Sequence, residues 1–558
     1  MAPLTRSYFC GASSTQIIYQ TIGRYFDEIV QVHPDNPALI VRHQGVSWTY
    51  RELQARVDQL ATGLLALNVR PGDRVGIWGP NSSEWVLVQL ATAKIGAVMV
   101  CINPAYRLYE LEYALNKVSC SVLICDVQFK TSDYLGMITT LAPELALSGH
   151  DHLQAAKLPH LRHVVRMGSE HTPGLHNFDD VCHKGGAVEL ELLQALQNQL
   201  KPDDAINIQF TSGTTGNPKG ATLSHCNILN NGFLTGLAMQ LTPSDKLCVP
   251  VPLYHCFGMV MSVLACVSHG ATMVFPGPSF DPEDTLRTVE DESCTALHGV
   301  PTMFITELDH PKFRDFNLAS LRTGIMAGAP CPVEVMKRVI SEMHMESVLI
   351  AYGQTELSPI NHITRPDDSL KRRTETVGRA MPWVEIKIVD QEGHVVPVGE
   401  KGEICTRGYS VMQGYWDDPV KTAETIDASG WLHSGDLATM DDCGYVKIVG
   451  RIKDMIIRGG ENHFPAEIEA VLVTHRNVAQ MAVVGLPDEK WGEIIAAFIL
   501  SGTAPDVADL RAHCRVHLSA QKTPSVWVQV PEFPLTGSGK VQKFAIREQY
   551  LASSYGEL

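Results

Sequence analysis

One string of hydroxyl, glycine and lysine residues directly follows a short apolar run at 206–210. It consists of Thr211, Ser212, Gly213, Thr214, Thr215, Gly216, Asn217, Pro218, Lys219 and Gly220. Glycine amides, hydroxyl groups and one ammonium group make a loop that can fold over phosphate oxygens. The string is not a Walker A loop, because Lys219 is preceded by Pro218 and followed by Gly220. A surface turn without a ligand is the alternative.

A second polar string follows the apolar run 348–351 and consists of Tyr352, Gly353, Gln354, Thr355 and Glu356. The flat ring of Tyr352 can pack on a base, and the carboxylate of Glu356 is a suitable ligand for a hard cation such as Mg²⁺. The alternative is a strand end with a solvated glutamate. Because the second string comes in series with the first, we favour the interpretation that both bind a ligand.

Two further segments carry residues that could contact the same ligand. Gly328, Ala329 and Pro330 follow a predicted strand at 322–327, where small residues allow a close approach. An ordinary strand-to-helix turn explains them as well. Asp436 ends the string Trp-Leu-His-Ser-Gly-Asp, and one carboxylate can accept hydrogen bonds from two vicinal hydroxyls.

Basic residues cluster in the last quarter of the chain. Arg451, Lys453 and Arg458 would suit a polyanionic ligand in an otherwise acidic chain, although solvated linker charges are the alternative. Lys540 ends the string Pro-Leu-Thr-Gly-Ser-Gly-Lys, in which glycines would let the lysine swing. On its own, Lys540 could equally be a surface lysine.

A nucleophilic cysteine–histidine pair is suggested by His255 and Cys256. We reject this interpretation, because adjacent residues rarely point at each other and no Asn or Asp that would orient the histidine is evident. The sequence therefore predicts chemistry that needs no protein nucleophile.

Alternating strands and helices must position these residues. Strands are predicted at 75–78, 97–102, 122–125, 206–210, 247–251 and 272–275, with helical stretches between them. This alternation favours layered α/β subdomains with parallel strands. A β-rich subdomain is expected after about residue 374, followed by a small, mobile α+β domain with a helix at 466–473 and a strand at 480–484. We place the domains at 1–450 and 451–558.

Length, charge and cysteine pattern limit the class of protein. A chain of 558 residues needs two or more domains. The net charge of -16 argues against a nucleic-acid or anionic-membrane binder. The 14 cysteines form no C-x-x-C pair, which argues against a zinc ribbon and favours a reducing compartment. The apolar run 256–267 is too short to span a bilayer, and no signal peptide is recognisable. We expect an intracellular soluble protein, cytoplasmic or processed in the mitochondrial matrix, whose oligomeric state stays open.

With these motifs in order over nearly the whole chain, the sequence resembles the acyl-adenylate superfamily of acyl-CoA synthetases, luciferases and peptide-synthetase adenylation domains. The strings at 220–225 and 453–462 are similar to the medium-chain acyl-CoA ligases of the mitochondrial family member 2 type. The resemblance implies that a carboxylic acid and ATP form acyl-AMP and pyrophosphate, after which coenzyme A displaces AMP. Mg²⁺ is the implied cofactor.

The resemblance also implies a role for each motif residue. The string 211–219 binds ATP, Tyr352 and 328–330 enclose adenine, Thr355 meets the α-phosphate, Glu356 holds Mg²⁺, Asp436 binds ribose, and Arg451 contacts the nucleotide. Lys540 acts in acyl-AMP formation, Lys453 is the hinge, Gly459 and Gly460 pass beside the pantetheine of CoA, and His255 and Gly353 line the acyl pocket. Acetate-specific relatives have Trp at the position of Gly353, so acids of medium length are expected here.

Two other functions remain open at this point. A ligase could transfer the acyl group to a carrier protein, or the chain could be a non-catalytic ligand-binding protein that kept the fold. The joint presence of Glu356, Asp436, Arg451 and Lys540 argues against the second. An assay of pyrophosphate release separates it from both enzymes.

Overall fold

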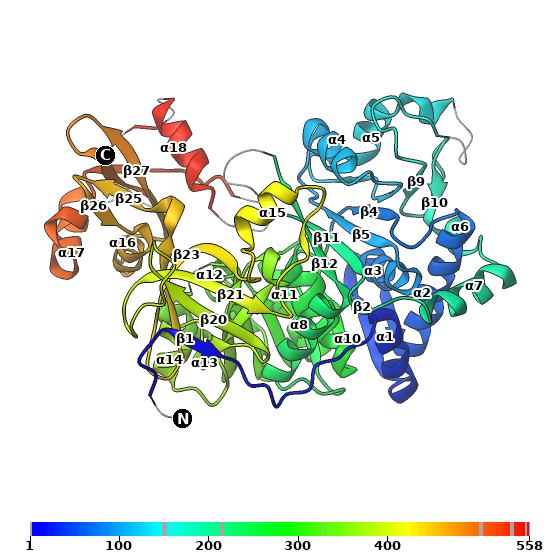
Figure 1. The fold of residues 1–558 in the computed structure, drawn as a ribbon, viewed down its shortest axis with the longest axis horizontal. Coiled ribbons are helices and arrows are strands. Elements are labelled where there is room, and N and C mark those ends of the chain that lie inside the picture. The colour runs from blue at the N-terminus through cyan, green and yellow to red at the C-terminus, as the bar shows by residue number, and fades with distance from the viewer. Residues whose placement is uncertain are drawn as a thin grey trace.

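The computed structural model describes residues 3–147, 153–211, 217–329, 331–501, 506–535, 541–552 and 555–556. Within these residues, three large sheets and one two-stranded sheet build a large N-terminal part, and a fifth sheet builds a smaller C-terminal part, which lies at the upper left in Figure 1. The predicted fold class, a layered α/β protein with a β-rich subdomain and a small C-terminal α+β domain, is confirmed. The boundary at residue 450 stays a prediction, although strand β24 ends at Arg451.

Two large sheets form the α/β layers. The eight-stranded sheet contains, in spatial order, β10 (His176–Asn177), β9 (His163–Arg166), β6 (Val122–Cys125), β4 (Arg74–Trp78), β5 (Val98–Ile102), β11 (Ala205–Thr211), β12 (Lys219–Ser224) and β22 (Gly414–Tyr415). The nine-stranded sheet contains β19 (Arg379–Ala380), β18 (Ile360–Ile363), β17 (Ser347–Gly353), β16 (Thr323–Ala327), β15 (Ala296–Gly299), β13 (Lys246–Cys248), β14 (Thr272–Phe275), β2 (Pro37–Val41) and β3 (Val46–Thr49). Strands β9, β6, β4, β5 and β11 pair in parallel, as do β14, β13, β15, β16 and β17.

The apolar runs predicted as strands all form strands, with one shortened. Strand β6, for example, is buried throughout, as expected for a parallel strand covered on both faces. The run 247–251 is a strand only as far as Cys248. Beyond that point, Val251 accepts a hydrogen bond from Asn81 Nδ2 at 2.9 Å, so its carbonyl is satisfied outside a strand ladder.

Helices in the N-terminal part cover these sheets (Figure 1). They are α1 (Ile22–Val32), α2 (Tyr50–Ala66), α3 (Ser83–Ile95), α4 (Leu108–Lys117), α5 (Tyr134–Leu141), α6 (Phe178–Cys182), α7 (Ala187–Gln197), α8 (His225–Ala238), α9 (Cys256–Gly258), α10 (Ala265–His269), α11 (Pro282–Glu292), α12 (Pro301–Leu308), α13 (Val333–Glu342), α14 (Leu370–Glu375) and α15 (Pro419–Thr425). Short 3₁₀ helices are η1 (Arg42–Gln44), η2 (Pro143–Ala146), η4 (Phe313–Asp315), η5 (Thr355–Leu357) and η6 (Ile452–Asp454), and η3 (Met259–Leu264) is a π-helix. A small hairpin joins β7 (Gln128–Phe129) to β8 (Ser132–Asp133).

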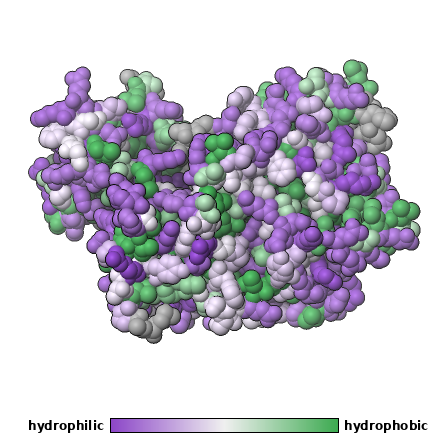
Figure 2. Space-filling view, in the orientation of Figure 1, coloured by the Kyte–Doolittle hydropathy of each residue, from purple (hydrophilic) through white to green (hydrophobic). Residues whose placement is uncertain are grey.

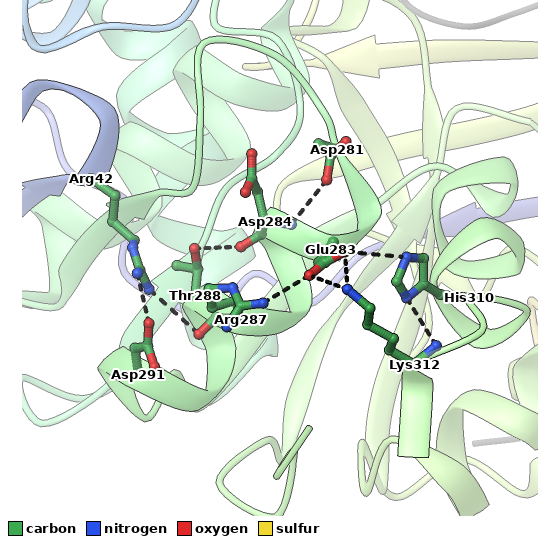
Figure 3. A network of polar contacts seen from close by, with 9 residues as sticks. All are labelled: Arg42, Asp281, Glu283, Asp284, Arg287, Thr288, Asp291, His310 and Lys312. Carbon is green, nitrogen blue, oxygen red and sulfur yellow. Dashed lines mark hydrogen bonds and ion pairs between the residues drawn. The ribbon is translucent and has the colours of Figure 1, made fainter. Parts of the chain in front are cut away.

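Helix α11 begins as its sequence predicts (Figure 3). Asp281 Oδ1 accepts a hydrogen bond from the amide of Asp284 at 3.0 Å, and Pro282 occupies the first helical position, where no amide donor is needed. Glu283 in the first turn pairs with Lys312 at 3.1 Å. A carboxylate there also complements the positive end of the helix dipole.

Helix α3 follows a run of N-cap residue types at 81–83 but is capped in another way. Ser82 occupies the position before the helix, but its side chain makes no capping hydrogen bond. Instead, the amide of Ser83 donates to Gln44 Oε1 at 2.8 Å, so a side chain from η1 satisfies the exposed helix end.

The β-rich segment after residue 374 is a five-stranded sheet with the order β1 (Tyr8–Cys10), β20 (Val384–Val389), β21 (Gly402–Gly408), β23 (Leu432–Met440) and β24 (Val446–Arg451). Its strand pairs are antiparallel. The N-terminal strand β1 completes one edge, a long-range pairing that local sequence patterns do not predict.

The C-terminal part is a sheet of β26 (Glu461–His463), β25 (Ile456–Arg458), β28 (Gly492–Leu500), β27 (Gln480–Asp488) and β29 (Val526–Gln529). Helices α16 (Pro465–Leu472), α17 (Val507–His517) and α18 (Lys543–Leu551) and the 3₁₀ helix η7 (Ala520–Lys522) accompany it. The helix predicted at 466–473 and the strand predicted at 480–484 correspond to α16 and β27.

The face seen in Figure 2 is largely hydrophilic, with scattered apolar residues and a notch between the N-terminal and C-terminal parts. In the described residues, none of the helices combines the length and the apolar character needed to cross a membrane. All 14 cysteines are described and free.

Candidate functional site

The candidate site lies where several strands of the two large sheets end. Strands β16 and β17 are parallel neighbours in which Ala327 pairs with Ala351. Gly328 and Tyr352, which directly follow these two residues, therefore lie at the same edge of the sheet. In open α/β sheets this edge, beyond the carboxyl ends of the strands, is where ligands bind. Gly328 is exposed and has a φ of 93°, which only glycine adopts without strain.

A carboxylate from the five-stranded sheet reaches this edge. Tyr352 donates a hydrogen bond from its hydroxyl to Asp436 Oδ2 at 2.7 Å. Arg451 Nε lies 3.0 Å from Asp436 Oδ1. Burial, together with the charge of Asp436, raises the pKa of Tyr352 well above its usual value, so the hydroxyl stays a donor. Three predicted site residues that are distant in sequence are thus in direct contact.

The position of Asp436 depends on irregular strand pairing. Cys405 pairs with His433 and Glu403 with Leu437, so β23 has two more residues than β21 between these pairs. Gly435, with a φ of 71°, lies in this bulge. Bulges re-aim side chains next to functional sites. Asp436 is also paired directly with Arg451 of β24, which explains their ion pair.

A second series of contacts joins the phosphate-loop lysine to the candidate metal ligand. Lys219 Nζ donates to the hydroxyl of Tyr415 at 2.8 Å, and this hydroxyl donates to Glu356 Oε1 at 2.7 Å. Lys219 opens β12 opposite Thr211 at the end of β11, so the two described ends of the loop are paired. Glu356 is only 9% exposed. Desolvation by burial, and next the positive charge of Lys453, lower the pKa of Lys219, although Glu356 opposes this shift.

A basic cavity of about 230 Å³ opens beside this series of contacts. Asn217, Lys219 and Tyr415 line it together with Lys117 and Lys421. Asp418 also lines the cavity, and Lys421 Nζ is paired with Glu424 Oε2 at 2.7 Å. The three ammonium groups outnumber the lining carboxylate, so the cavity is suited to an anionic ligand such as a polyphosphate. Lys117 and Lys421 did not stand out in the sequence, because isolated lysines carry no local pattern.

The residues around Glu356 fit a hard cation. Within the described part of the chain, Oε1 is the oxygen of Glu356 that has a hydrogen-bond partner, so Oε2 is available as a ligand. Thr355 supplies a neighbouring hydroxyl. Carboxylate and hydroxyl oxygens are the ligands that Mg²⁺ accepts, and the ion keeps several waters and substrate phosphates around it. The predicted metal ligand therefore fits the ion chemically.

His255 and Cys256 lie next to this motif. Burial, with smaller contributions from Cys101 and Glu356, raises the pKa of Cys256 well above its usual value, although Thr355 opposes the shift. A thiol held protonated is a poor nucleophile. His255 Nδ1 accepts from the amide of Phe257 at 3.1 Å, so the two side chains are engaged separately. The geometry supports the rejection of a cysteine–histidine nucleophile.

From the sequence, Gly353 is expected to lie at the wall of the acyl pocket and, because it has no side chain, to leave this wall open. The described residues around Gly353 leave no such opening. A Cβ built on Gly353 would lie 2.0 Å from the carbonyl oxygen of Pro359 and 2.7 Å from the Cα of Ile360. The space beside Gly353 is filled by backbone, so this glycine permits a close strand approach. We therefore expect Gly353→Trp to disturb the fold rather than to shorten the acyl pocket.

The C-terminal candidates lie on two connected segments. Lys453 lies in η6, directly after β24. Its positive charge contributes to the lowered pKa of Lys219. Gly459 and Gly460 form the two-residue turn between β25 and β26, with φ values of 60° and 84°. Such a hairpin turn requires positive φ at both positions, so the glycines have a structural reason of their own. Among the described residues, no hydrogen bond or ion pair joins this hairpin to Tyr352 or Glu356.

Several predicted residues lie outside the described residues. These are Ser212, Gly213, Thr214, Thr215, Gly216, Pro330 and Lys540. The structure brings together Tyr352, Asp436 and Arg451, and separately Lys219 and Glu356, through a residue that the sequence analysis missed. That residue is Tyr415, whose only local signal is the sequence Gly-Tyr-Trp in a segment rich in turn residues.

Comparison with known proteins shows to which family the chain belongs. The model of the AMP-binding enzyme family matches residues 26–416, and the model of the AMP-binding enzyme C-terminal domain matches residues 467–540. The chain is an adenylate-forming enzyme and belongs to the AMP-binding enzyme family.

The relatives narrow the class further. The chain is 45% identical to YngI of Bacillus subtilis (strain 168), which is named an acyl-CoA synthetase, over 96% of this chain and 98% of YngI. It is 43% identical to the mitochondrial medium-chain acyl-CoA ligase ACSF2 of Danio rerio, over 98% of this chain and 91% of the relative. The crystal structure of the anthranilate CoA ligase AuaEII in complex with anthranoyl-AMP matches with a TM-score of 0.85 at 27% identity, covering 97% of this chain and 99% of that one. The predicted family, and the prediction that the protein is an enzyme of the acyl-CoA ligase type, are confirmed.

Proposed function

We propose that this protein is an ATP-dependent ligase that joins medium-chain fatty acids to coenzyme A and uses Mg²⁺. The observation that carries the proposal is a pair of contact series, Lys219–Tyr415–Glu356 and Tyr352–Asp436–Arg451, which both start from the segment 352–356 at the end of β17. The first series suits a polyphosphate and the second a nucleoside. The medium-chain substrate is supported by relatives of that name.

In the proposed first step, a carboxylate oxygen of the acid attacks the α-phosphorus of ATP. The bond from this phosphorus to the bridging oxygen breaks, and pyrophosphate leaves with the electron pair. Tyr352 and Asp436 hold the nucleoside, while Lys219 and Lys540 neutralise the negative charge that gathers in the transition state. Mg²⁺, when bound at Glu356, would supply further charge neutralisation at the phosphates.

In the proposed second step, the thiol of coenzyme A attacks the acyl carbonyl of acyl-AMP. AMP leaves, and the thiol proton passes to solvent. No side-chain nucleophile is needed, which agrees with the raised pKa of the buried Cys256 thiol. The hairpin turn at Gly459 and Gly460 would come beside the pantetheine only after the C-terminal part has moved about the hinge at Lys453.

The hinge can be tested by Lys453→Pro. Proline fixes φ, removes the amide donor and disfavours the helical conformation of Ile452. Since domain motion rests on a few linker residues, we expect one half-reaction to fall while the other keeps its rate. Rates of acyl-AMP formation and of thioester formation from supplied acyl-AMP are measured separately.

Lys453→Ala is the matched control for Lys453→Pro, because it removes the charge near Lys219 but leaves the backbone free to turn. If Lys453→Pro keeps both half-reactions at wild-type rates, the hinge assignment is wrong. If alanine and proline act alike, the charge of Lys453 matters and its backbone does not.

The chain-length preference is tested with a series of acids from two to eighteen carbons. Each CH₂ buried in the acyl pocket should add about 0.8 kcal/mol, or roughly fourfold in kcat/KM, until the pocket ends. We therefore expect octanoate to be favoured over acetate by several orders of magnitude. CoA-dependent AMP formation is the measurement. Preference for acetate would contradict the proposal, and pyrophosphate release that needs a carrier protein instead of CoA would replace it with the alternative ligase.

A further inference from the structure

Three side chains with metal-binding atoms meet on one face of the five-stranded sheet, at the bulge that precedes Asp436. Glu403 and Cys405 are two residues apart on β21, and Cys405 is paired directly with His433 on β23. Side chains at this spacing and pairing point to the same face of a sheet. Their ligand atoms all lie within 4.8 Å of one another.

We propose that Glu403, Cys405 and His433 form a binding site for a divalent transition-metal ion of the zinc class. A thiolate, an imidazole and a carboxylate are the ligands that Zn²⁺ takes in proteins, usually four in a tetrahedron. The thiolate also separates this site from that of Mg²⁺, which selects oxygen ligands. The inference goes beyond the ligase reaction, in which none of the three side chains contacts a substrate, although Glu403 Oε1 also accepts from the amide of Gly435 at 2.9 Å in the bulge beside Asp436.

The distances are close to those of a tetrahedral site. Zinc bonds of about 2.0–2.3 Å place neighbouring ligand atoms roughly 3.3–3.7 Å apart. His433 Nδ1 lies 3.5 Å from Cys405 Sγ and 2.8 Å from Glu403 Oε2. Glu403 must therefore withdraw by less than an ångström, and a water molecule would fill the fourth position. His433 and Glu403 are partly exposed, which gives an ion access.

A fourth residue is placed to orient the histidine. Asp427 Oδ2 lies 3.8 Å from His433 Nε2, on the side of the ring opposite Cys405 and Glu403. Asp427 Oδ1 accepts from the amides of Ser429 and Trp431, so the carboxylate is held in place. Histidines that bind metal through one ring nitrogen usually donate the other N–H to such a carboxylate.

Binding of the ion changes where His433 and Cys405 carry their protons. When Nδ1 of His433 coordinates the ion, it can no longer donate a proton to Glu403, and the ring proton is then carried by Nε2, which lies 3.8 Å from Asp427 Oδ2. Cys405 loses its thiol proton to solvent, as a coordinating thiol does. Without a metal, burial raises the pKa of Cys405 to about 12, so the free side chain is a neutral thiol. The alternative is a histidine–glutamate hydrogen bond between two strands, in which Cys405 has no part.

The test is a titration of the purified, metal-free, full-length protein with Co²⁺, which replaces zinc and absorbs light. Coordination by a thiolate gives a ligand-to-metal charge-transfer band in the ultraviolet. We expect this band to saturate at one equivalent per chain, to be removed by Zn²⁺ and to be lost in Cys405→Ser. Cys443→Ser is the matched control, because Cys443 lies in an exposed cluster with Asp441 and Asp442, and it should keep the band.

A second variant tests whether Asp427 supports metal binding by orienting His433. Asp427→Asn keeps the shape and all three ligands, and should weaken Co²⁺ binding by about 10–100-fold with the band retained. The proposal is overturned if no thiolate band forms, if the band persists in Cys405→Ser, or if Asp427→Asn binds as tightly as the wild type. Melting curves of each variant confirm that it is folded. Since every readout is metal binding, the result does not depend on the proposed ligase activity.

Discussion

Replacing Lys540 with alanine is expected to slow acyl-AMP formation from ATP by at least about 10²–10³-fold, the usual loss when one electrostatic contact to a transition state is removed. The transition state joins an anionic carboxylate to an anionic phosphate, so one missing cation is costly. Lys540 lies outside the described residues, but the ends of its loop are anchored, because Leu535 and Val541 pair and Gln542 donates to the carbonyl of Pro534 at 2.8 Å. The reaction of supplied acyl-AMP with CoA should change much less, and substrate binding little.

The control for Lys540→Ala is Lys543→Ala in the same segment. Lys543 Nζ is paired with Glu469 Oε1 at 2.7 Å, so its loss affects the packing of the C-terminal part rather than charge at the phosphates. We expect Lys543→Ala to alter both half-reactions alike, if at all. If Lys540→Ala forms acyl-AMP at the wild-type rate, Lys540 is a solvated surface lysine with no part in the reaction. Equal loss in both half-reactions, with a lowered melting temperature, would show damage to the fold.

Periodicity and helix-capping patterns predict the parallel strands and the start of α11, because both depend on neighbouring residues. The apolar runs that became β6 and β14 have the predicted bounds. The run 247–251 was predicted too long, since apolar character does not reveal that Val251 is hydrogen-bonded to Asn81 from another helix start. Strand β1 was missed for the same reason, because its partner β20 lies more than three hundred residues away.

In the candidate site, too, local sequence patterns predict some residues, and only long-range contacts reveal the others. Motif order and residue chemistry predict Tyr352, Asp436 and Arg451, but only the extra residues of β23 explain how Asp436 reaches Tyr352. Tyr415 could not be predicted, because its role comes from contacts with Lys219 and Glu356 across two sheets. Gly353 gave a misleading signal, since a glycine that opens a pocket and a glycine that admits a neighbouring backbone look alike in sequence.

Asp436→Asn is expected to raise the KM for ATP and to lower kcat/KM for ATP by at least about 10²-fold, since each hydrogen bond to a charged group contributes roughly 1.5–3 kcal/mol. The buried carboxylate accepts from Tyr352 and pairs with Arg451, and its remaining lone pairs can accept from two ribose hydroxyls. Asparagine keeps the shape but offers one acceptor, and its amide group would face either Arg451 or Tyr352 as a second donor. The steady-state rate at varied ATP concentration is the measurement.

Asp442→Asn is the matched control for Asp436→Asn, because it makes the same change of charge at an exposed position six residues further along the chain. It should leave the KM for ATP unchanged. A lowered melting temperature in Asp436→Asn alone would reflect the unpaired Arg451, so binding of AMP to the folded variant must be measured as well. If Asp436→Asn binds AMP and turns over ATP as the wild type does, Asp436 is only an anchor for Arg451 and Tyr352. The nucleoside would then have to be held elsewhere, and the site defined by the strand ends of β16 and β17 would lose its strongest support.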